Sequence, residues 1–296
     1  ALVADAREAL TALAAGLAGW SAGDEYRALA RRLAAEWDDT VTRAYHLGHQ
    51  PRPAQSEVIG VVNEVSGPRD VVLCAAGSMP GDLHTLWRAR DPKGYHVEYG
   101  YSCMGYEIAG GLGAKLAAPD RDVYVMVGDG SYLMMAQELV TAVAEGVKLI
   151  VVLVQNQGFA SIGALSETVG APRFGTWYRY RDRATGRLDG GVLPVDLAAN
   201  AQSLGARVLR AQTIDEFRAA LIEARQDPGP GPVVVHVETD PLVPAPDSQA
   251  WWDVPVAEVA ELDATRQARK AYEASRAQQR QFLTPAANPG DERERS

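Results

Sequence analysis

The stretch that determines the fold of this chain runs from Val123 to Phe159. It begins with VYVMVGDGS (residues 123–131), continues through an amphipathic run to Glu145, and ends with LIVVLVQNQGF (residues 149–159). Two apolar runs separated by a helical period and bounded by glycine predict a strand, a tight turn, a helix, a second strand and a second turn. Asp129 and Asn156 would each follow the end of a strand.

The same alternation of helix and strand extends over most of the chain. Residues 71–75 form a continuous apolar run, which is typical of a strand buried on both faces. Residues 104–116 have a helical pattern, and we expect the small residues Gly105, Ala109 and Gly113 to form its closely packed face. Residues 158–194 are predicted to be one long loop. The expected fold is α/β, with about six parallel strands and helices on both faces of the sheet.

Three regions are expected along the chain. Residues 1–50 are predicted to be a helical lead-in, the end of a preceding domain, because no strand separates their two helical patterns and Pro51 and Pro53 would interrupt a longer helix. Residues 51–240 would form the main α/β domain. Residues 241–296 would form a C-terminal extension with a charged helix over 258–282 and a polar tail.

Composition excludes several classes of function. The 296 residues are 47% apolar and 23% charged, with a net charge of −9 and a pI near 5.1. This acidic balance argues against binding to nucleic acid or to an anionic membrane surface. No apolar run reaches the ~20 residues of a membrane span, and no basic leader precedes an apolar block. The two cysteines, Cys74 and Cys103, have no CxxC partner, so we expect buried, reduced thiols and a cytoplasmic setting.

Asp129 and Asn156 predict a metal site. They are 27 positions apart, which leaves room for one helix and one strand, so both would emerge at neighbouring strand ends. A carboxylate, an amide oxygen and the nearby Gly158 carbonyl are ligands that suit Mg²⁺, and the glycine turn suits a phosphate group. The alternative is that Gly-Asp-Gly is a plain turn and Asn156 a turn residue.

This spaced pair resembles the signature of thiamine diphosphate enzymes, and residues 54–245 resemble their C-terminal, diphosphate-binding part. The resemblance implies that Asp129, Asn156 and the Gly158 carbonyl hold Mg²⁺. It also implies a set of cofactor-binding residues: Gly77, Ser78, Ser102, Met104, Gly130, Ser131, Asn156 and Phe159.

Met104 and Ser102 lie at the start of the helical pattern of residues 104–116. Met104 matches the bulky apolar residue that, in the family, separates the two rings of the cofactor and forces its bent shape. The Ser102 carbonyl would bind the aminopyrimidine ring. The family often has glycine at this position, so Ser102 departs from the pattern. Without the resemblance, Met104 would be interpreted as a core residue.

Further segments resemble a narrower family, the trihydroxycyclohexane-1,2-dione hydrolases of inositol catabolism. This resemblance implies hydrolytic cleavage of a C–C bond in a cyclic polyol dione to give 5-deoxyglucuronate. The segments that carry it are residues 76–84, 92–107, 173–175, 178–181 and 251–254. Candidate contacts to such a substrate are His84, His96, Glu98, Arg179 and Arg181, each of which could equally have a surface or structural role.

One component of the family is not recognised in this chain. The glutamate that activates the cofactor belongs to a pyrimidine-binding domain that precedes the diphosphate domain, so we expect it outside this chain. The resemblance implies a homodimer or homotetramer in which a second subunit supplies that domain. Two alternatives stay open: an acetolactate synthase-like carboligase or 2-oxo acid decarboxylase, and a non-catalytic binding or assembly module of the same fold.

Overall fold

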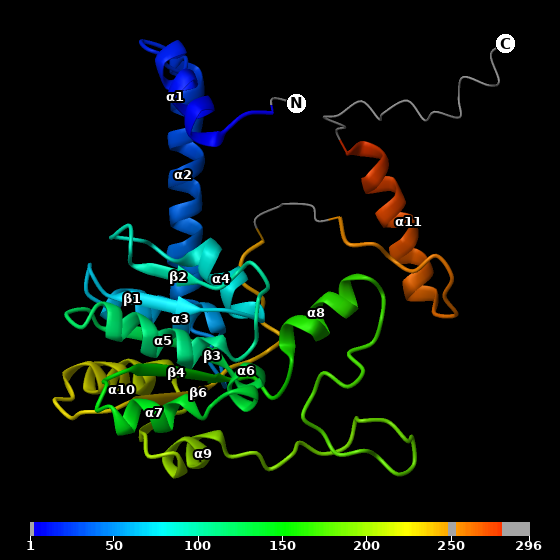
Figure 1. The fold of residues 1–296 in the computed structure, drawn as a ribbon. Coiled ribbons are helices and arrows are strands. Elements are labelled where there is room, and N and C mark those ends of the chain that lie inside the picture. The colour runs from blue at the N-terminus through cyan, green and yellow to red at the C-terminus, as the bar shows by residue number, and fades with distance from the viewer. Residues whose placement is uncertain (1–2, 248–252, 280–296) are drawn as a thin grey trace.

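A computed structural model describes residues 3–247 and 253–279. Its centre is a six-stranded sheet in which all pairs of neighbouring strands are parallel, in the order β2-β1-β3-β4-β6-β5 (Figure 1). The predicted α/β class with about six parallel strands is confirmed. The strands are β1 Val71–Cys74, β2 Tyr95–Val97, β3 Val123–Gly128, β4 Ile150–Gln155, β5 Arg207–Ala211 and β6 Val233–Glu238.

Helices cover both faces of the sheet, and each face has its own apolar core. One core lies under α3 (Gln55–Val65), α4 (Ser78–Leu86), α10 (Ile214–Gln226) and the last turn of α2 (Asp24–Tyr45). The other lies under α5 (Tyr106–Ala117), α7 (Glu138–Ala144) and α9 (Leu197–Ser203). Strands β1, β3, β4 and β6 are buried on both faces, as their apolar runs predict, whereas the edge strands β2 and β5 are partly exposed.

The order in which the chain adds strands to the sheet changes direction beside β1, and this change determines where a crevice opens. From β1 the chain crosses to β2 on one side, and then passes β1 to reach β3 on its other side. The loops that leave β1 and β3 therefore diverge to opposite faces and open a crevice at the carboxyl ends of the strands. Open parallel sheets bind ligands at such a point.

Two predictions about this region are wrong. The run from Ser131 to Glu145 is not one helix but two short ones, α6 (Asp129–Met134) and α7, which are separated by a non-helical backbone at Met135. A Cβ atom on Gly105 would lie 2.9 Å from Met135 Cβ, so the break brings Met135 against the start of α5. Residues 158–194 are not all loop, because they contain α8 (Ala160–Thr168).

The closely packed face of α5 is also different from the predicted one. Gly113 is exposed and has open space around it, whereas Gly111 is buried against β3. A Cβ atom on Gly111 would lie 2.2 Å from Val125 Cγ2. The predicted face is therefore only partly right, because Gly105 packs closely against Met135 whereas Gly113 does not, and the closest approach to the sheet is at Gly111. The prediction of two buried thiols is half wrong as well, because Cys74 is buried and Cys103 is exposed.

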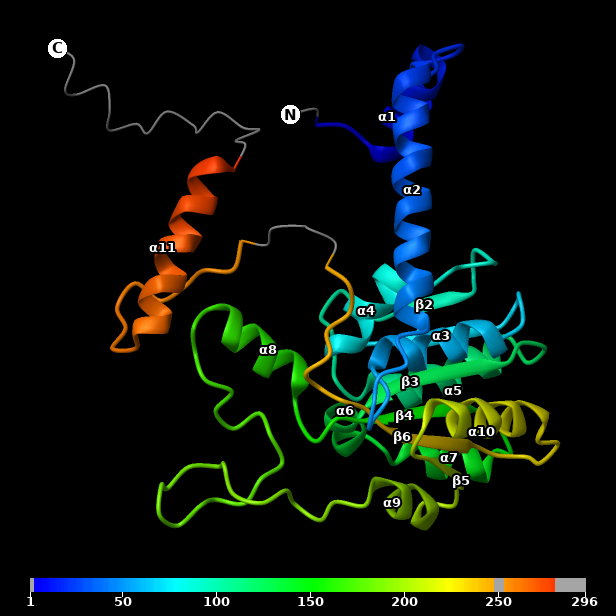
Figure 2. The ribbon, with the colours of Figure 1, turned by 180° about the vertical axis from the view of Figure 1, so that it is seen from behind.

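The two ends of the chain extend away from the sheet. Helix α1 (Ala6–Gly16) and most of α2 form a projecting arm, and α11 (Asp263–Gln278) lies beyond α8 (Figures 1 and 2). The last turn of α2 is buried in the core through Val41, Ala44 and Tyr45. Packing is therefore continuous across residue 50, and the three-region division stays a prediction. Trp251, Trp252 and the polar tail lie outside the described residues. None of the described helices combines the length and apolarity needed to cross a membrane.

Candidate functional site

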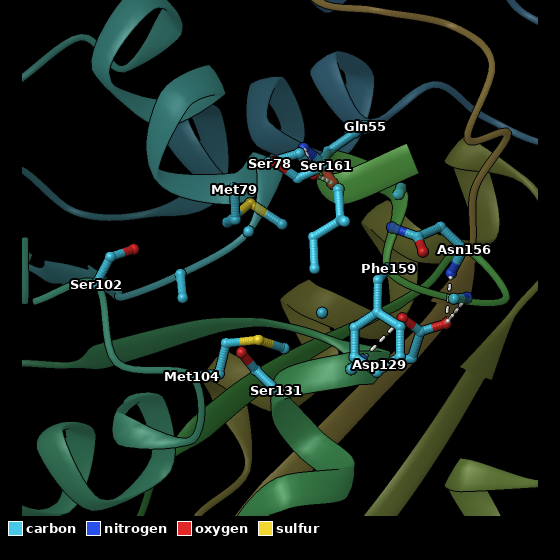
Figure 3. Close-up of a pocket in the computed structure, with 17 residues that line it drawn as sticks. Gln55, Ser78, Met79, Ser102, Met104, Asp129, Ser131, Asn156, Phe159 and Ser161 are labelled. Carbon is cyan, nitrogen blue, oxygen red and sulfur yellow. Dashed lines mark hydrogen bonds between the residues drawn. The ribbon is translucent and has the colours of Figure 1, made fainter. Parts of the chain in front are cut away.

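A pocket opens at the carboxyl ends of the central strands (Figure 3). Its wall comes from the start of α3, from the loops after β1, β2 and β3, and from the segment between β4 and α8. These segments are adjacent because the strand order places β2, β1, β3 and β4 side by side. The lining residues include Gly77, Ser78, Ser102, Met104, Asp129, Gly130, Ser131, Asn156, Gly158 and Phe159.

Asp129 is the most constrained side chain of the pocket, being only 1% exposed. Its Oδ1 accepts a hydrogen bond from the Gly130 amide at 2.9 Å. Its Oδ2 accepts from the amides of Asn156 at 3.0 Å and Gly158 at 3.2 Å. Burial raises the pKa of Asp129 to about 6, and the backbone donors oppose that rise. The carboxyl group thus joins the ends of β3 and β4, as the 27-position spacing predicts.

The side-chain amide of Asn156 presents one terminal atom to two oxygens. That atom lies 3.3 Å from Asp129 Oδ1 and 2.9 Å from the Gly158 carbonyl oxygen. Both neighbours are acceptors, so the amide nitrogen satisfies them when no cation is present. Turning the amide by 180° brings a third oxygen to the same point. Three oxygens that face one another are a ligand set suited to Mg²⁺.

The donor types agree with this interpretation. Among the described residues, no group of three or more His, Cys, Asp or Glu side chains could hold a metal ion. A site with one carboxylate, one amide and one carbonyl leaves coordination positions open for oxygens of a ligand. Magnesium is bound in this way in many proteins, through few protein ligands together with phosphate oxygens.

A later loop fixes the backbone on both sides of Gly158, and thereby the direction of its carbonyl group. Residues 157–159 pair with residues 176–178: the Phe159 amide donates to the Thr176 carbonyl at 2.8 Å, and the Tyr178 amide donates to the Gln157 carbonyl at 2.9 Å. A Cβ atom on Gly158 would lie 2.1 Å from the Thr176 oxygen, so only glycine fits here. The loop that carries residues 178–181 therefore fixes the backbone of residues 157–159.

Gly130, Phe159 and Met104 meet inside the pocket. A Cβ atom on Gly130 would lie 2.9 Å from the Phe159 ring and 3.2 Å from Met104 Cε. The absence of a side chain at Gly130 thus leaves room between Met104 and Phe159, which both point into the pocket in Figure 3. Met104 precedes α5 and points into the pocket, so a simple core role does not describe it.

Ser102 has a left-handed backbone conformation, which glycine adopts more readily than other residues. Its φ of 52° lies in the left-handed region, which is unusual for a residue with a side chain. Glu98 stabilises this loop, because its carboxylate accepts from the amides of Tyr101 at 3.1 Å and Cys103 at 2.7 Å. These two backbone donors lower the pKa of Glu98.

Gly77 and Ser78 form the start of α4. Gly77 has φ 89° and ψ −151°, a conformation that residues with a side chain avoid. The Ser78 side chain is within hydrogen-bonding distance of the Gln55 amide, whose nitrogen also donates to Asp82 Oδ2 at 2.6 Å. Burial raises the pKa of Asp82 to about 6, against the hydrogen bond from Gln55.

The five candidate substrate contacts lie outside the pocket wall. His84 and His96 contact different neighbours: His84 Nδ1 lies 2.7 Å from the Pro80 carbonyl, and His96 Nε2 lies 2.8 Å from the Tyr106 hydroxyl. Arg179 and Arg181 donate to carbonyls of their own loop, those of Gly190 and Gly186. These contacts are local and structural, and a role of these residues or of Glu98 in substrate binding stays a prediction.

Several pocket residues are not predicted by the sequence. They are Gln55, Ala76, Met79, Gly128, Ala160, Ser161 and Ile162. Gln55 comes from the first turn of a helix that precedes β1, and no motif marks it. Ser161 and Ile162 come after Phe159 in α8, within the range predicted to be loop, so a helix prediction there would have placed them beside Asn156 and Gly158.

The fold and pocket define a class of protein that sequence comparison identifies. Residues 75–237 match the family described as thiamine pyrophosphate enzyme, C-terminal TPP binding domain. The match covers more than half of the chain, and the chain belongs to this family. Thiamine pyrophosphate and thiamine diphosphate are two names for the same cofactor.

Its relatives agree with the narrower resemblance. The chain is 42% identical over 219 residues to 3D-(3,5/4)-trihydroxycyclohexane-1,2-dione hydrolase 1 of Bacillus cereus (strain ZK / E33L), which covers 74% of this chain and 33% of the relative. It is 35% identical over 296 residues to hydrolase 2 of the same strain, covering 92% of this chain and 45% of that protein. The chain therefore spans between a third and a half of the length of these relatives.

A solved structure shows the same fold. It is a thiamine diphosphate-dependent 4-hydroxybenzoylformate decarboxylase of Rhodococcus jostii RHA1, with a TM-score of 0.53 and 18% identity. The match covers 64% of this chain and 33% of that protein. At this identity the likeness concerns the fold alone.

Proposed function

We propose that this chain is the diphosphate-binding part of a thiamine diphosphate- and Mg²⁺-dependent hydrolase. Its substrate would be a trihydroxycyclohexane-1,2-dione, cleaved at a C–C bond to give 5-deoxyglucuronate in inositol catabolism. The observation that carries the proposal is the convergence of Asp129, Asn156 and the Gly158 carbonyl at one edge of the pocket. The 42% identity to a hydrolase of this name supports the substrate class.

Three atoms of this chain would hold Mg²⁺: a carboxylate oxygen of Asp129, the amide oxygen of Asn156 and the Gly158 carbonyl oxygen. Gly77, Ser78, Gly130 and Ser131 would meet the diphosphate. When bound, thiamine diphosphate supplies a nucleophilic carbon and an electron sink for breaking a C–C bond beside a carbonyl group.

The other pocket residues would orient the cofactor and exclude water. Met104 and Phe159 face each other across Gly130 and would provide apolar contact to its rings. The Ser102 carbonyl, in its left-handed loop, would accept from the aminopyrimidine. Candidates for contact with the polar groups of the substrate remain residues that do not line the pocket itself: His84, His96, Glu98, Arg179 and Arg181.

The activating glutamate and the rest of the substrate site would come from a pyrimidine-binding domain outside these 296 residues. We infer a homodimer or homotetramer in the cytoplasm in which that domain reaches the pocket from another subunit. The exposed apolar side chains on α6 and α7 support such contacts, and they are Leu133, Met134, Met135, Val140 and Val143.

The test is an assay of the natural, full-length polypeptide. Its turnover of the cyclic dione and of 2-oxo acids such as pyruvate is measured with and without thiamine diphosphate and Mg²⁺. We expect hydrolysis of the dione that needs both, and at least a hundredfold loss in Asp129→Ala, because a buried metal ligand is removed. Asp120→Ala is the matched control, since its side chain is 63% exposed and pairs with Arg69.

Each other result has a defined meaning. Turnover of 2-oxo acids instead of the dione would identify a carboligase or decarboxylase. Cofactor binding without any turnover would indicate a non-catalytic module of the same fold. Dione hydrolysis that continues unchanged in Asp129→Ala would overturn the assigned metal site.

A further inference from the structure

Glu107 is a buried carboxyl group that contacts three loops of the pocket at once. It lies in the first turn of α5 and is 1% exposed. Its Oε1 accepts from the Ala76 amide at 3.3 Å, and its Oε2 accepts from the Gly105 amide at 3.0 Å. The Ser131 hydroxyl is its third hydrogen-bonding neighbour. One side chain therefore joins the loop after β1, the loop before α5 and the segment after β3.

Each of these loops carries residues of the proposed cofactor site. Ala76 precedes Gly77 and Ser78, Gly105 comes directly after Met104, and Ser131 itself lines the pocket. Glu107 is not part of the pocket wall but lies directly behind it. A shift of its carboxyl group would move the three loops relative to one another.

Stability alone does not account for a carboxyl group at this position. Burial raises the pKa of Glu107, while the hydrogen bonds from Ser131, Ala76 and Gly105 oppose that rise. No ion pair with Glu107 is found in the part of the chain that the structure describes. A buried carboxyl group without a cation is costly, and here donors from three separate pocket segments offset that cost. We therefore look for the role of Glu107 in the three segments that its carboxyl group joins.

We propose that Glu107 is the positioning residue that keeps the three pocket loops in the arrangement required to bind thiamine diphosphate. This inference rests on the proposed function of the pocket. Glu107 contacts none of the proposed metal ligands. It lies behind the pocket wall, so it would not contact the cofactor either. Glutamine cannot substitute fully, because both carboxyl oxygens accept from backbone amides and glutamine would present an NH₂ group to one of them.

The test compares cofactor affinity in the natural, full-length polypeptide and in Glu107→Gln. The dissociation constant of thiamine diphosphate is measured by calorimetry at saturating Mg²⁺, together with the melting temperature. We expect Glu107→Gln to raise this constant at least tenfold. Its Mn²⁺ affinity at saturating thiamine diphosphate should stay within threefold of wild type, because the metal ligands are untouched. A merely structural role would not separate the two affinities.

Asp70→Asn is the matched control. Asp70 lies at the opposite end of β1, has a side chain that is 12% exposed, and accepts from the Gly67 amide at 2.5 Å. The control should lower the melting temperature and leave the thiamine diphosphate affinity within twofold of wild type. Glu107→Gln with wild-type affinity, or an equal loss of affinity in Asp70→Asn, would overturn the inference.

Two further measurements separate the possible failures. If the wild type binds no thiamine diphosphate, the proposed function fails first. If the wild type binds thiamine diphosphate but Glu107→Gln does not fold, amide hydrogen exchange of the wild type without cofactor tests the role of Glu107. The Ala76 and Gly105 amides should then exchange at least a hundredfold more slowly than the amide of Gly100, an exposed residue of the loop after β2. Exchange at equal rates would refute the role of Glu107.

Discussion

Asp129 is subject to two opposing effects on its protonation. It is buried, which favours the protonated form, yet three backbone amides donate to it, which favours the charged form. A bound cation would resolve this conflict by neutralising the charge that burial disfavours. The arrangement thus prepares an acid for metal binding while the backbone fixes its orientation.

Asp82 gives a pH-dependent prediction with a defined sign. In the folded protein its pKa is raised to about 6 by burial, whereas the ordinary value is 3.8. Between these values the folded state holds a proton that the unfolded chain has lost, so the free energy of unfolding falls as pH rises from about 4 to 6. Asp82→Asn should remove this contribution and flatten the profile by about 1–3 kcal/mol.

Urea unfolding of both proteins at pH 4.5 and pH 7 measures this difference. Asp129 has a raised pKa too and adds a slope of the same sign to both, so the variant profile should be flatter but not flat. Equal slopes in the two proteins would contradict the assignment to Asp82.

The meeting of Asp129 and Asn156 could be predicted from the sequence, whereas other residues at the pocket could not. Asp129 and Asn156 come after neighbouring strands, and the geometry of a parallel sheet fixes where such residues meet. Gln55 and Glu107 are brought to the pocket by the packing of α3 and α5. The apolar pattern of a helix predicts its buried face, but not which of its polar residues will lie at a site. Ser102 lies where the resemblance predicts because its backbone, rather than its side chain, is what the position requires.

Helix α5 shows how packing selects among glycines. Gly111 permits the close approach of α5 to β3, and Gly113 on the same helix faces open space. Gly111→Ala should therefore destabilise the protein by about 1–3 kcal/mol, since the added methyl group overlaps Val125. Thermal or urea unfolding measures the change.

Gly113→Ala is the matched control on the same helix. It adds a methyl group without a clash and improves helix propensity, so it should stabilise the protein by about 0.5–1 kcal/mol. Equal destabilisation by the two substitutions would mean that α5 can shift away from β3 without cost.

Strands are easier to predict here than the short helices beside them. The runs over β1, β3, β4 and β6 are buried on both faces and therefore continuously apolar. Helix α8 buries only Gly163 among its nine residues, so it has no apolar stripe to reveal it. The break between α6 and α7 depends on contact of Met135 with Gly105, which no local pattern indicates.

For the molecule as a whole, we predict that residues 1–296 alone do not catalyse. The chain matches less than half the length of its relatives, and the activating glutamate of the family is expected outside these residues. Purified chain should give no turnover of the cyclic dione above the uncatalysed rate, with or without thiamine diphosphate and Mg²⁺. The natural full-length polypeptide, assayed in parallel, is the positive control. Sustained cofactor-dependent turnover by the short chain would refute this prediction.

The pocket wall is discontinuous in sequence, since its residues extend from Gln55 to Ile162 across several separate segments. A ligand seated there would act as a reversible cross-link between these segments. Binding that favours only the folded state adds about 2.7 kcal/mol to the free energy of unfolding when the ligand is a hundredfold above its dissociation constant. The supply of cofactor in the cell would then set not only how many molecules are active, but how long each survives proteolysis.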